Sequence, residues 1–360
     1  MSENPYRGLP PRNFWRSMAG QPAFEVDPVA PQDTRITRGE RVATAGSCFA
    51  QHIAARLKMS GFNFYVSEAA HAIIQPDVAR KFNYGVFSAR YGNIYTVLQL
   101  RQLFDRVYGR FQPVEDVWEE AGGRFSDPFR PAIMPNFFSS VEEYWKDREV
   151  HFAAVRTMFE NMDVFVFTLG LTECWVSKQD GAAYPLCPGV SAGRFDPAKH
   201  AFENHDVAHM LANMTYFLTQ LKLVNPNCRV ILTVSPVPLV ATYESRHALV
   251  STTYSKSALR VLADAICREN NHVAYFPSFE IITGNYNRGA YFADDLRNIL
   301  DSGVDHVMRL FFAHFTTGQA DELPEIAPLP PAGSVEHAKK IAEAICEEVA
   351  LDASFEADLR

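Results

Sequence analysis

One serine of this chain follows a short apolar run in a way that suits nucleophilic chemistry. The run 41–45 has strand length and ends in Gly46-Ser47, and residues 51–59 then repeat apolar side chains at helical spacing. A serine in this position lies at the carboxyl edge of an α/β sheet, where backbone N–H groups of the next turn point at its substrate. The alternative is that Ser47 only caps the helix, because serine is a common N-cap residue.

The pentapeptide Gly46-Ser-Cys-Phe-Ala50 resembles the signature of the GSCFA family, a bacterial group that is similar to the SGNH/GDSL esterases and acyltransferases. Further similar stretches lie at 84–95, 168–175, 235–238 and 275–280, so the resemblance covers most of residues 35–315. It implies a three-layer α/β/α hydrolase-like fold with Ser47 as the nucleophile. It implies no particular substrate.

The same resemblance suggests groups that bind the oxyanion. SGNH enzymes carry Gly-x-Asn-Asp after a later strand, where this chain reads Gly170-Leu-Thr-Glu173, so Thr172 stands in the place of the asparagine. A capping or loop pair is the alternative for Thr172 and Glu173. The other usual donor is a glycine N–H of the second block, for which Gly92 is the better candidate. Its neighbour Asn93 carries a side-chain amide that can supply the donor that Thr172 lacks.

The general base is where the sequence departs most from the SGNH pattern. Those enzymes carry Asp-x-x-His before the last helix, but Asp295-x-x-Asn298 ends in an amide, which accepts no proton near neutral pH. His306 follows eight residues later, in the expected first turn of the closing helix. We expect His306 to take over the base role, kept neutral by the helix start, with Asp295 or Asp301 orienting it. The alternative is a surface or capping histidine.

The sequence gives little sign of a metal or another cofactor. His200, His205 and His209 lie near one another, and the last two would share one helical face, but no third ligand is evident. The six cysteines include no Cys-x-x-Cys pair and are expected to be reduced thiols. We therefore expect no cofactor and no metal.

Strands that alternate with helices predict the sheet that must position these residues. Strand-length apolar runs lie at 41–45, 62–66, 163–169, 228–234 and 272–276. The run 163–169 is almost continuously apolar, which is typical of a central strand covered on both faces. The five runs predict a flavodoxin-like parallel sheet in the order 2-1-3-4-5, with Ser47 at the switch point beside strand one.

Segments outside this sheet complete the predicted organisation. An N-terminal arm spans 1–34, the α/β domain spans 35–318, and a linker with an amphipathic helix spans 319–360. Within the domain, the insertion 67–150 contains two helical patterns, near 97–107 and 141–157, and is expected to form a lid or pocket wall. The Gly- and Pro-rich stretch 177–206 is expected to be an ordered loop.

Composition narrows the class of protein. The 360 residues are 47% hydrophobic and carry a formal charge of −8, with no Lys/Arg-rich run, so nucleic acid is not an expected partner. The first residues do not resemble a signal peptide, and no stretch reaches the roughly 18 apolar residues that span a bilayer. We expect a soluble cytoplasmic protein, and its oligomeric state is left open.

These observations predict a serine-dependent acyl-ester hydrolase or O-acyltransferase. Ser47 attacks the ester, His306 relays the proton, and the N–H groups of Ser47 and Gly92, with Asn93 or Thr172, hold the oxyanion. Aromatic residues of the insertion suit stacking on a sugar, and the family is similar to carbohydrate-modifying proteins, so an O-acetylated saccharide is the expected substrate. The alternatives are a catalytically silent glycan- or acyl-binding module and a scaffold subunit of an envelope-polysaccharide assembly.

Overall fold

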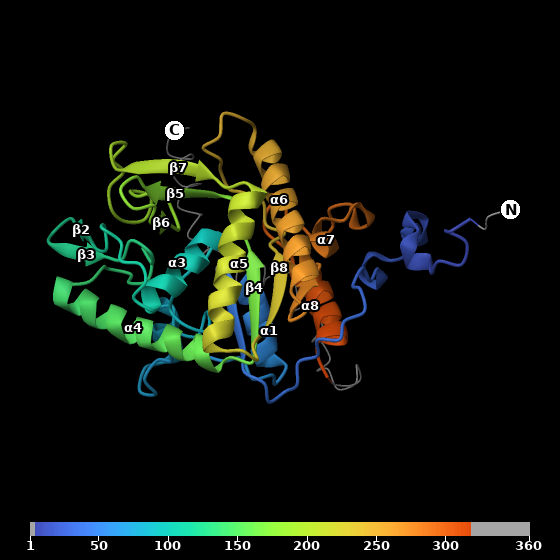
Figure 1. Ribbon diagram of the computed structural model, residues 1–360, viewed down its shortest axis with the longest axis horizontal. Coiled ribbons are helices and arrows are strands. Elements are labelled where there is room, and N and C mark those ends of the chain that lie inside the picture. Colours follow the sequence, from blue (N-terminus) through green and yellow to red (C-terminus); the bar gives the residue numbers. More distant parts are fainter. Residues whose placement is uncertain (1–3, 318–360) are drawn as a thin grey trace.

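A four-stranded parallel sheet lies at the centre of the computed structural model, which describes residues 4–317 (Figure 1). Its strands are β1 (Val42–Gly46), β4 (Val164–Leu169), β8 (Arg229–Val234) and β9 (Val273–Phe276), in the order β1-β4-β8-β9. All residues of β1 and β4 are buried, which explains their continuous apolar sequences. The linker and helix predicted at 319–360 lie outside the described residues.

Helices cover both faces of this sheet. One face packs on α1 (Phe49–Met59), α7 (Ser278–Thr283) and α8 (Asp301–Phe315). The other packs on α3 (Val97–Val107), α4 (Val141–Asn161), α5 (Val207–Val224) and α6 (Ala248–Glu269). Along β4, Phe165 and Phe167 enter the second core while Val164 and Val166 enter the first, as strand alternation requires. The fold is therefore a three-layer α/β/α arrangement, and that prediction is confirmed.

The predicted second strand at 62–66 is reduced to a single parallel bridge between Phe64 and Val42. Counting this bridge, the strand order agrees with the predicted 2-1-3-4-5. The strand stops there because other groups bind the edge of β1 at its next position. The Ser88 hydroxyl accepts a hydrogen bond from Thr44 N–H at 3.0 Å, and the Tyr91 hydroxyl donates to Thr44 O. The segment around 88–94 consequently runs beside β1 toward its carboxyl end.

Both helical patterns of the insertion are confirmed, as α3 and α4. Thr96 begins α3 with a capping box, in which its hydroxyl accepts from Gln99 N–H and the Gln99 side chain accepts from the Thr96 N–H. The insertion also contains α2 (Pro76–Lys81) and the hairpin of β2 (Trp118–Glu120) and β3 (Arg124–Ser126). In Figure 1, α3 and α4 lie on the same side of the sheet as α5.

Two segments of the stretch 177–206, predicted as an ordered loop, instead pair with the strand that precedes it to form a second, antiparallel sheet. Its strands are β5 (Glu173–Ser177), β6 (Ala183–Tyr184) and β7 (His200–Asn204), in the order β6-β5-β7. Trp175 lies opposite Phe202, and their rings are 5.7 Å apart. Such cross-strand aromatic pairs stabilise a short sheet.

The N-terminal arm extends to one side of the body before it reaches β1 (Figure 1). It contains three 3₁₀ turns, η1 (Pro11–Asn13), η2 (Trp15–Met18) and η3 (Ala23–Glu25), and a fourth, η4 (Asn285–Asn287), follows α7. The end of the arm pairs with the end of α8, where Ile36 N–H donates to Phe315 O at 2.7 Å. Across residues 4–317, no helix has the length and apolar character that crossing a membrane requires.

Candidate functional site

Ser47 follows the last residue of β1 and precedes α1. The N-cap of α1 is Cys48, and no side chain caps the helix, so the alternative reading of Ser47 as a cap is wrong. The Ser47 residue is 4% exposed, and its hydroxyl has no hydrogen-bond partner within residues 4–317. Burying an unpaired hydroxyl costs free energy. Stability therefore does not explain why a serine stands here.

Two glycines let the chain close around Ser47. Gly46 has φ +135°, and a Cβ at this position would lie 2.4 Å from Thr168 O. Gly170, in the segment after β4, lies so close that a Cβ there would be 3.1 Å from the Cβ of Ser47. Ser47 N–H donates to Thr168 O at 3.4 Å, a long bond that holds this N–H weakly. The serine thus lies between the ends of β1 and β4.

The structure brings Gly92 and Asn93 to this place, as the sequence suggested. Ile94 N–H donates to Gly46 O at 2.9 Å, which fixes the segment beside the residue preceding Ser47. The side-chain oxygen of Asn93 accepts from Gln51 Nε2 at 3.3 Å, and Gln51 lies in the first turn of α1. Gly92 has φ +69°. Their role in binding an oxyanion stays a prediction.

Thr172 and Glu173 belong to another group of contacts. The Thr172 hydroxyl donates to Asn204 Oδ1 at 2.7 Å, and its N–H donates to Ser255 Oγ at 3.1 Å. The prediction that Thr172 donates to the oxyanion is therefore corrected, because its donors are engaged by other residues. The carboxylate of Glu173 accepts from the Thr242 hydroxyl at 2.7 Å. Burial raises the pKa of Glu173.

The structure also corrects the role predicted for His306. Its Nδ1 lies 2.8 Å from the Tyr291 hydroxyl and its Nε2 lies 3.0 Å from the carbonyl oxygen of Val26. A carbonyl can only accept, so Nε2 carries the proton and Nδ1 accepts from Tyr291. Both nitrogens are thereby used, so these contacts do not support His306 as a base for Ser47. Asp295 does not orient His306, because its carboxylate instead accepts from Arg297 N–H and Asn298 N–H.

Comparison with protein families supports the sequence signature. The model of the GSCFA family matches residues 41–311, which extend from the start of β1 to Phe311 in α8. The chain belongs to the GSCFA family. Among curated proteins, none matches it. The similarity to SGNH enzymes is a resemblance in the short sequence stretches described above.

Lys256 is a buried residue close to the candidate site that the sequence did not indicate. It lies on α6, is 2% exposed, and donates from Nζ to Gly170 O at 2.7 Å. Gly170 is the same residue that packs against Ser47. The sequence contained one sign that Lys256 is buried. It stands at helical spacing from Leu259 and Ala263, which places it on the apolar stripe of α6.

The three histidines that raised the question of a metal do not form one site in this GSCFA chain. His200 contacts Glu115 at 2.9 Å, whereas His205 contacts Cys174 and Glu203 at 3.5 and 3.1 Å. His209 packs its ring against that of His205. Throughout residues 4–317, no three potential ligands are grouped so that they could hold a metal ion.

Proposed function

We propose that this GSCFA protein is a serine-dependent acyl-ester hydrolase or O-acyltransferase. The observation that carries the proposal is the buried, unpartnered hydroxyl of Ser47, which follows a parallel strand and precedes the first turn of α1. The N-terminus of a helix stabilises negative charge, so an oxyanion that develops beside Ser47 lies in a favourable field. Asn93 supports the same role, because its side chain lies at this edge of the sheet.

In the proposed reaction, Ser47 Oγ forms a bond to the ester carbonyl carbon, and its proton passes to the amine of Lys256. Collapse of the tetrahedral intermediate breaks the ester C–O bond, and the protonated amine returns the proton to the departing alcohol. Water or an acceptor alcohol then cleaves the acyl-serine by the same steps in reverse order. Lys256 is chosen because it and Ser47 both contact Gly170, and because a lysine amine can accept a proton when it is uncharged.

Access to Ser47 requires movement. At 4% exposure, an ester cannot reach the hydroxyl until groups around it open. The proposed substrate is an O-acetylated saccharide. Among the insertion's aromatic residues, Tyr91, Tyr95 and Phe138 are buried and offer no face to a sugar, whereas Trp145 is 38% exposed. Further support comes from a cavity with polar groups beside the site, described below.

A catalytically silent glycan- or acyl-binding module is the second candidate. Asn298 is the observation that favours it, because an amide stands where SGNH enzymes carry the catalytic histidine and His306 does not replace it. A scaffold subunit of an envelope-polysaccharide assembly was the third possibility raised by the sequence, and the contacts above add nothing to it.

The test is reaction of the purified protein with a fluorophosphonate probe and with p-nitrophenyl acetate. Wild type should be labelled and should release p-nitrophenol, and Ser47→Ala should abolish both. Ser60→Ala is the matched control, because it removes a hydroxyl at the other end of α1 and should react like wild type. Absence of labelling in folded wild type would instead favour the binding module.

A further inference from the structure

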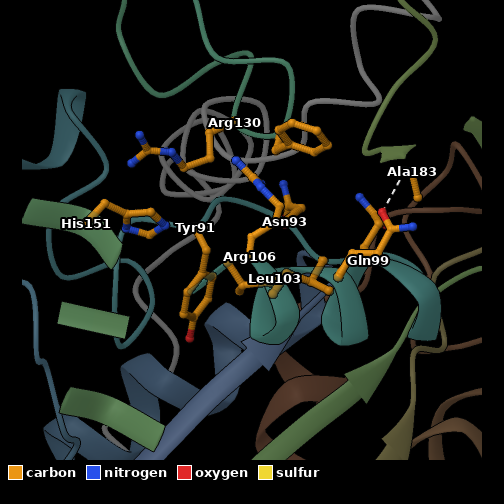
Figure 2. Close-up of a pocket in the computed structure, with 11 residues that line it drawn as sticks. Tyr91, Asn93, Gln99, Leu103, Arg106, Arg130, His151 and Ala183 are labelled. Atoms are coloured by element: carbon orange, nitrogen blue, oxygen red, sulfur yellow. Dashed lines mark hydrogen bonds between the residues drawn. The ribbon is translucent and has the colours of Figure 1, made fainter. Parts of the chain in front are cut away.

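A small, partly open cavity lies next to the Ser47 site. Its volume is about 30 Å³, which is enough for a water-sized group. It is lined from α3, from α4, from the segment 91–94, from Phe129 and Arg130, and from Ala183 of β6 (Figure 2). The lining combines apolar side chains with the charged or hydrogen-bonding side chains of Arg106, Arg130 and His151. Such a cavity is suited to a polar group.

His151 presents a bare acceptor to the cavity. Its Nδ1 lies 2.7 Å from Glu68 Oε2. Burial alone would raise the pKa of Glu68, but His151 and Arg130 lower it to about 2, so the carboxylate is charged and Nδ1 must be the protonated nitrogen. Burial lowers the pKa of His151, so the ring is neutral near pH 7 and Nε2 is an acceptor. It is buried and has no partner within residues 4–317, and His151 is 1% exposed.

Arg106 presents a donor. This side chain is 5% exposed, and its Nε–H has no acceptor in the part of the chain that the structure describes. The guanidinium lies over the ring of Phe129, 3.7 Å from its centre, which fixes its plane. The side-chain amide of Gln102, another lining residue, is already used. Gln102 donates to Gly181 O at 2.7 Å and accepts from Ala183 N–H at 2.8 Å.

Charge in the surrounding ion-pair cluster is balanced. Its arginines are Arg90, Arg106, Arg130 and Arg148, and its carboxylates are Glu68, Asp116, Asp127 and Asp147. Four positive charges thus meet four negative charges. A bound anion would disturb this balance, and its lone pairs would also face the lone pair of His151 Nε2. A neutral group with one donor and one acceptor satisfies both orphan atoms.

We infer that this cavity binds a hydroxyl group of a neutral polyol substrate, which donates to His151 Nε2 and accepts from Arg106 Nε–H. The inference rests on the proposed function, because it makes the cavity a subsite for the alcohol part of the ester. Its position supports this role. Asn93 and Ile94 line the cavity, and Ile94 N–H also binds Gly46 O beside Ser47. The wall of the cavity is thus part of the Ser47 site.

Glycerol is the probe for binding. In ¹⁵N-labelled protein, the Arg106 Nε–H and His151 Nε2 signals should shift saturably with glycerol, and 1,2-dimethoxyethane, a molecule of similar size whose ether oxygens accept but cannot donate, should shift them less. The variants Arg106→Lys and His151→Asn assign the two signals. His151→Asn keeps an N–H for Glu68, and its shorter side chain leaves no acceptor at the position of Nε2, so it is also the variant expected to keep the fold. Unchanged signals at high glycerol would overturn the inference and mean that the cavity holds only water.

Substrate preference is the second readout. Wild type should favour glycerol monoacetate over propyl acetate in kcat/KM, and His151→Asn should lower that preference at least about tenfold, because a site built for a hydroxyl discriminates strongly against its absence. His71→Gln changes an exposed histidine and serves as the control. Equal use of both esters with no glycerol shift would reject the cavity role while Ser47 chemistry stands. A glycerol shift without labelling of Ser47 would reject the proposed enzyme and leave a polyol-binding protein.

Discussion

Ser47 and Lys256 reach the same glycine from different elements. Ser47 comes from the β1–α1 connection, whereas Lys256 comes from α6, and the contact with Gly170 fixes both. A buried lysine here can act in two ways. As a neutral amine it would accept the serine proton, and as an ammonium it would only stabilise the oxyanion. A permanently charged side chain in place of Lys256 could still stabilise the oxyanion, but it could not accept the serine proton.

Substitution of Lys256 separates these roles. Lys256→Met should lower kcat for p-nitrophenyl acetate about 100-fold or more, the usual contribution of a general base. Lys256→Arg should be equally impaired, because a guanidinium stays protonated and cannot accept a proton. Lys222→Met, an exposed lysine on α5, is the control. Recovery of activity in Lys256→Arg would show that only the positive charge matters, provided circular dichroism shows that both variants fold.

At the scale of elements, the end of β1 depends on how closely it approaches β4. Gly46→Ala should destabilise the protein by roughly 2–4 kcal/mol, because its methyl group would collide with backbone at Thr168 in a buried sheet. Gly61→Ala is a matched control at φ +73° with open space around it, and it should cost only about 1 kcal/mol. Urea unfolding measures both, and equal losses would mean that φ alone matters at Gly46.

The central strands could be predicted because a strand that is buried on both faces has a continuous apolar sequence, as β4 does. The small antiparallel sheet could not be predicted from the sequence. Its strands β5 and β7 are separated by more than twenty residues of chain, and β6 is only two residues long. That Ser47 and Asn93 lie at the same edge of the sheet could be predicted because each belongs to a short local motif, whereas their role stays a prediction. His306 was misassigned because the sequence does not show that the N-terminal arm covers its face of α8.

The arm joins the two ends of the described chain into one body. Val26 O accepts from His306, Asp27 contacts His314 at 2.6 Å, and Arg35 donates to Ala313 O at 2.7 Å. These contacts follow one side of α8, whose opposite side packs in the core with α1 and α7. The role of His306 is therefore to hold the arm on α8, which makes the attachment sensitive to protonation.

Burial lowers the pKa of His306 to about 4, although the Val26 carbonyl acts in the opposite direction. An unfolded histidine has a pKa near 6.5, so between these values the unfolded chain binds the extra proton. The contribution of His306 should be complete above about pH 6.5 and decline as the pH falls toward 4, by up to about 3 kcal/mol. Urea unfolding at pH 7 and pH 4 measures this loss. His306→Gln keeps a donor for Val26 but does not titrate, so it should lose less stability over the same interval, whereas identical losses in the two proteins would contradict a neutral, buried His306.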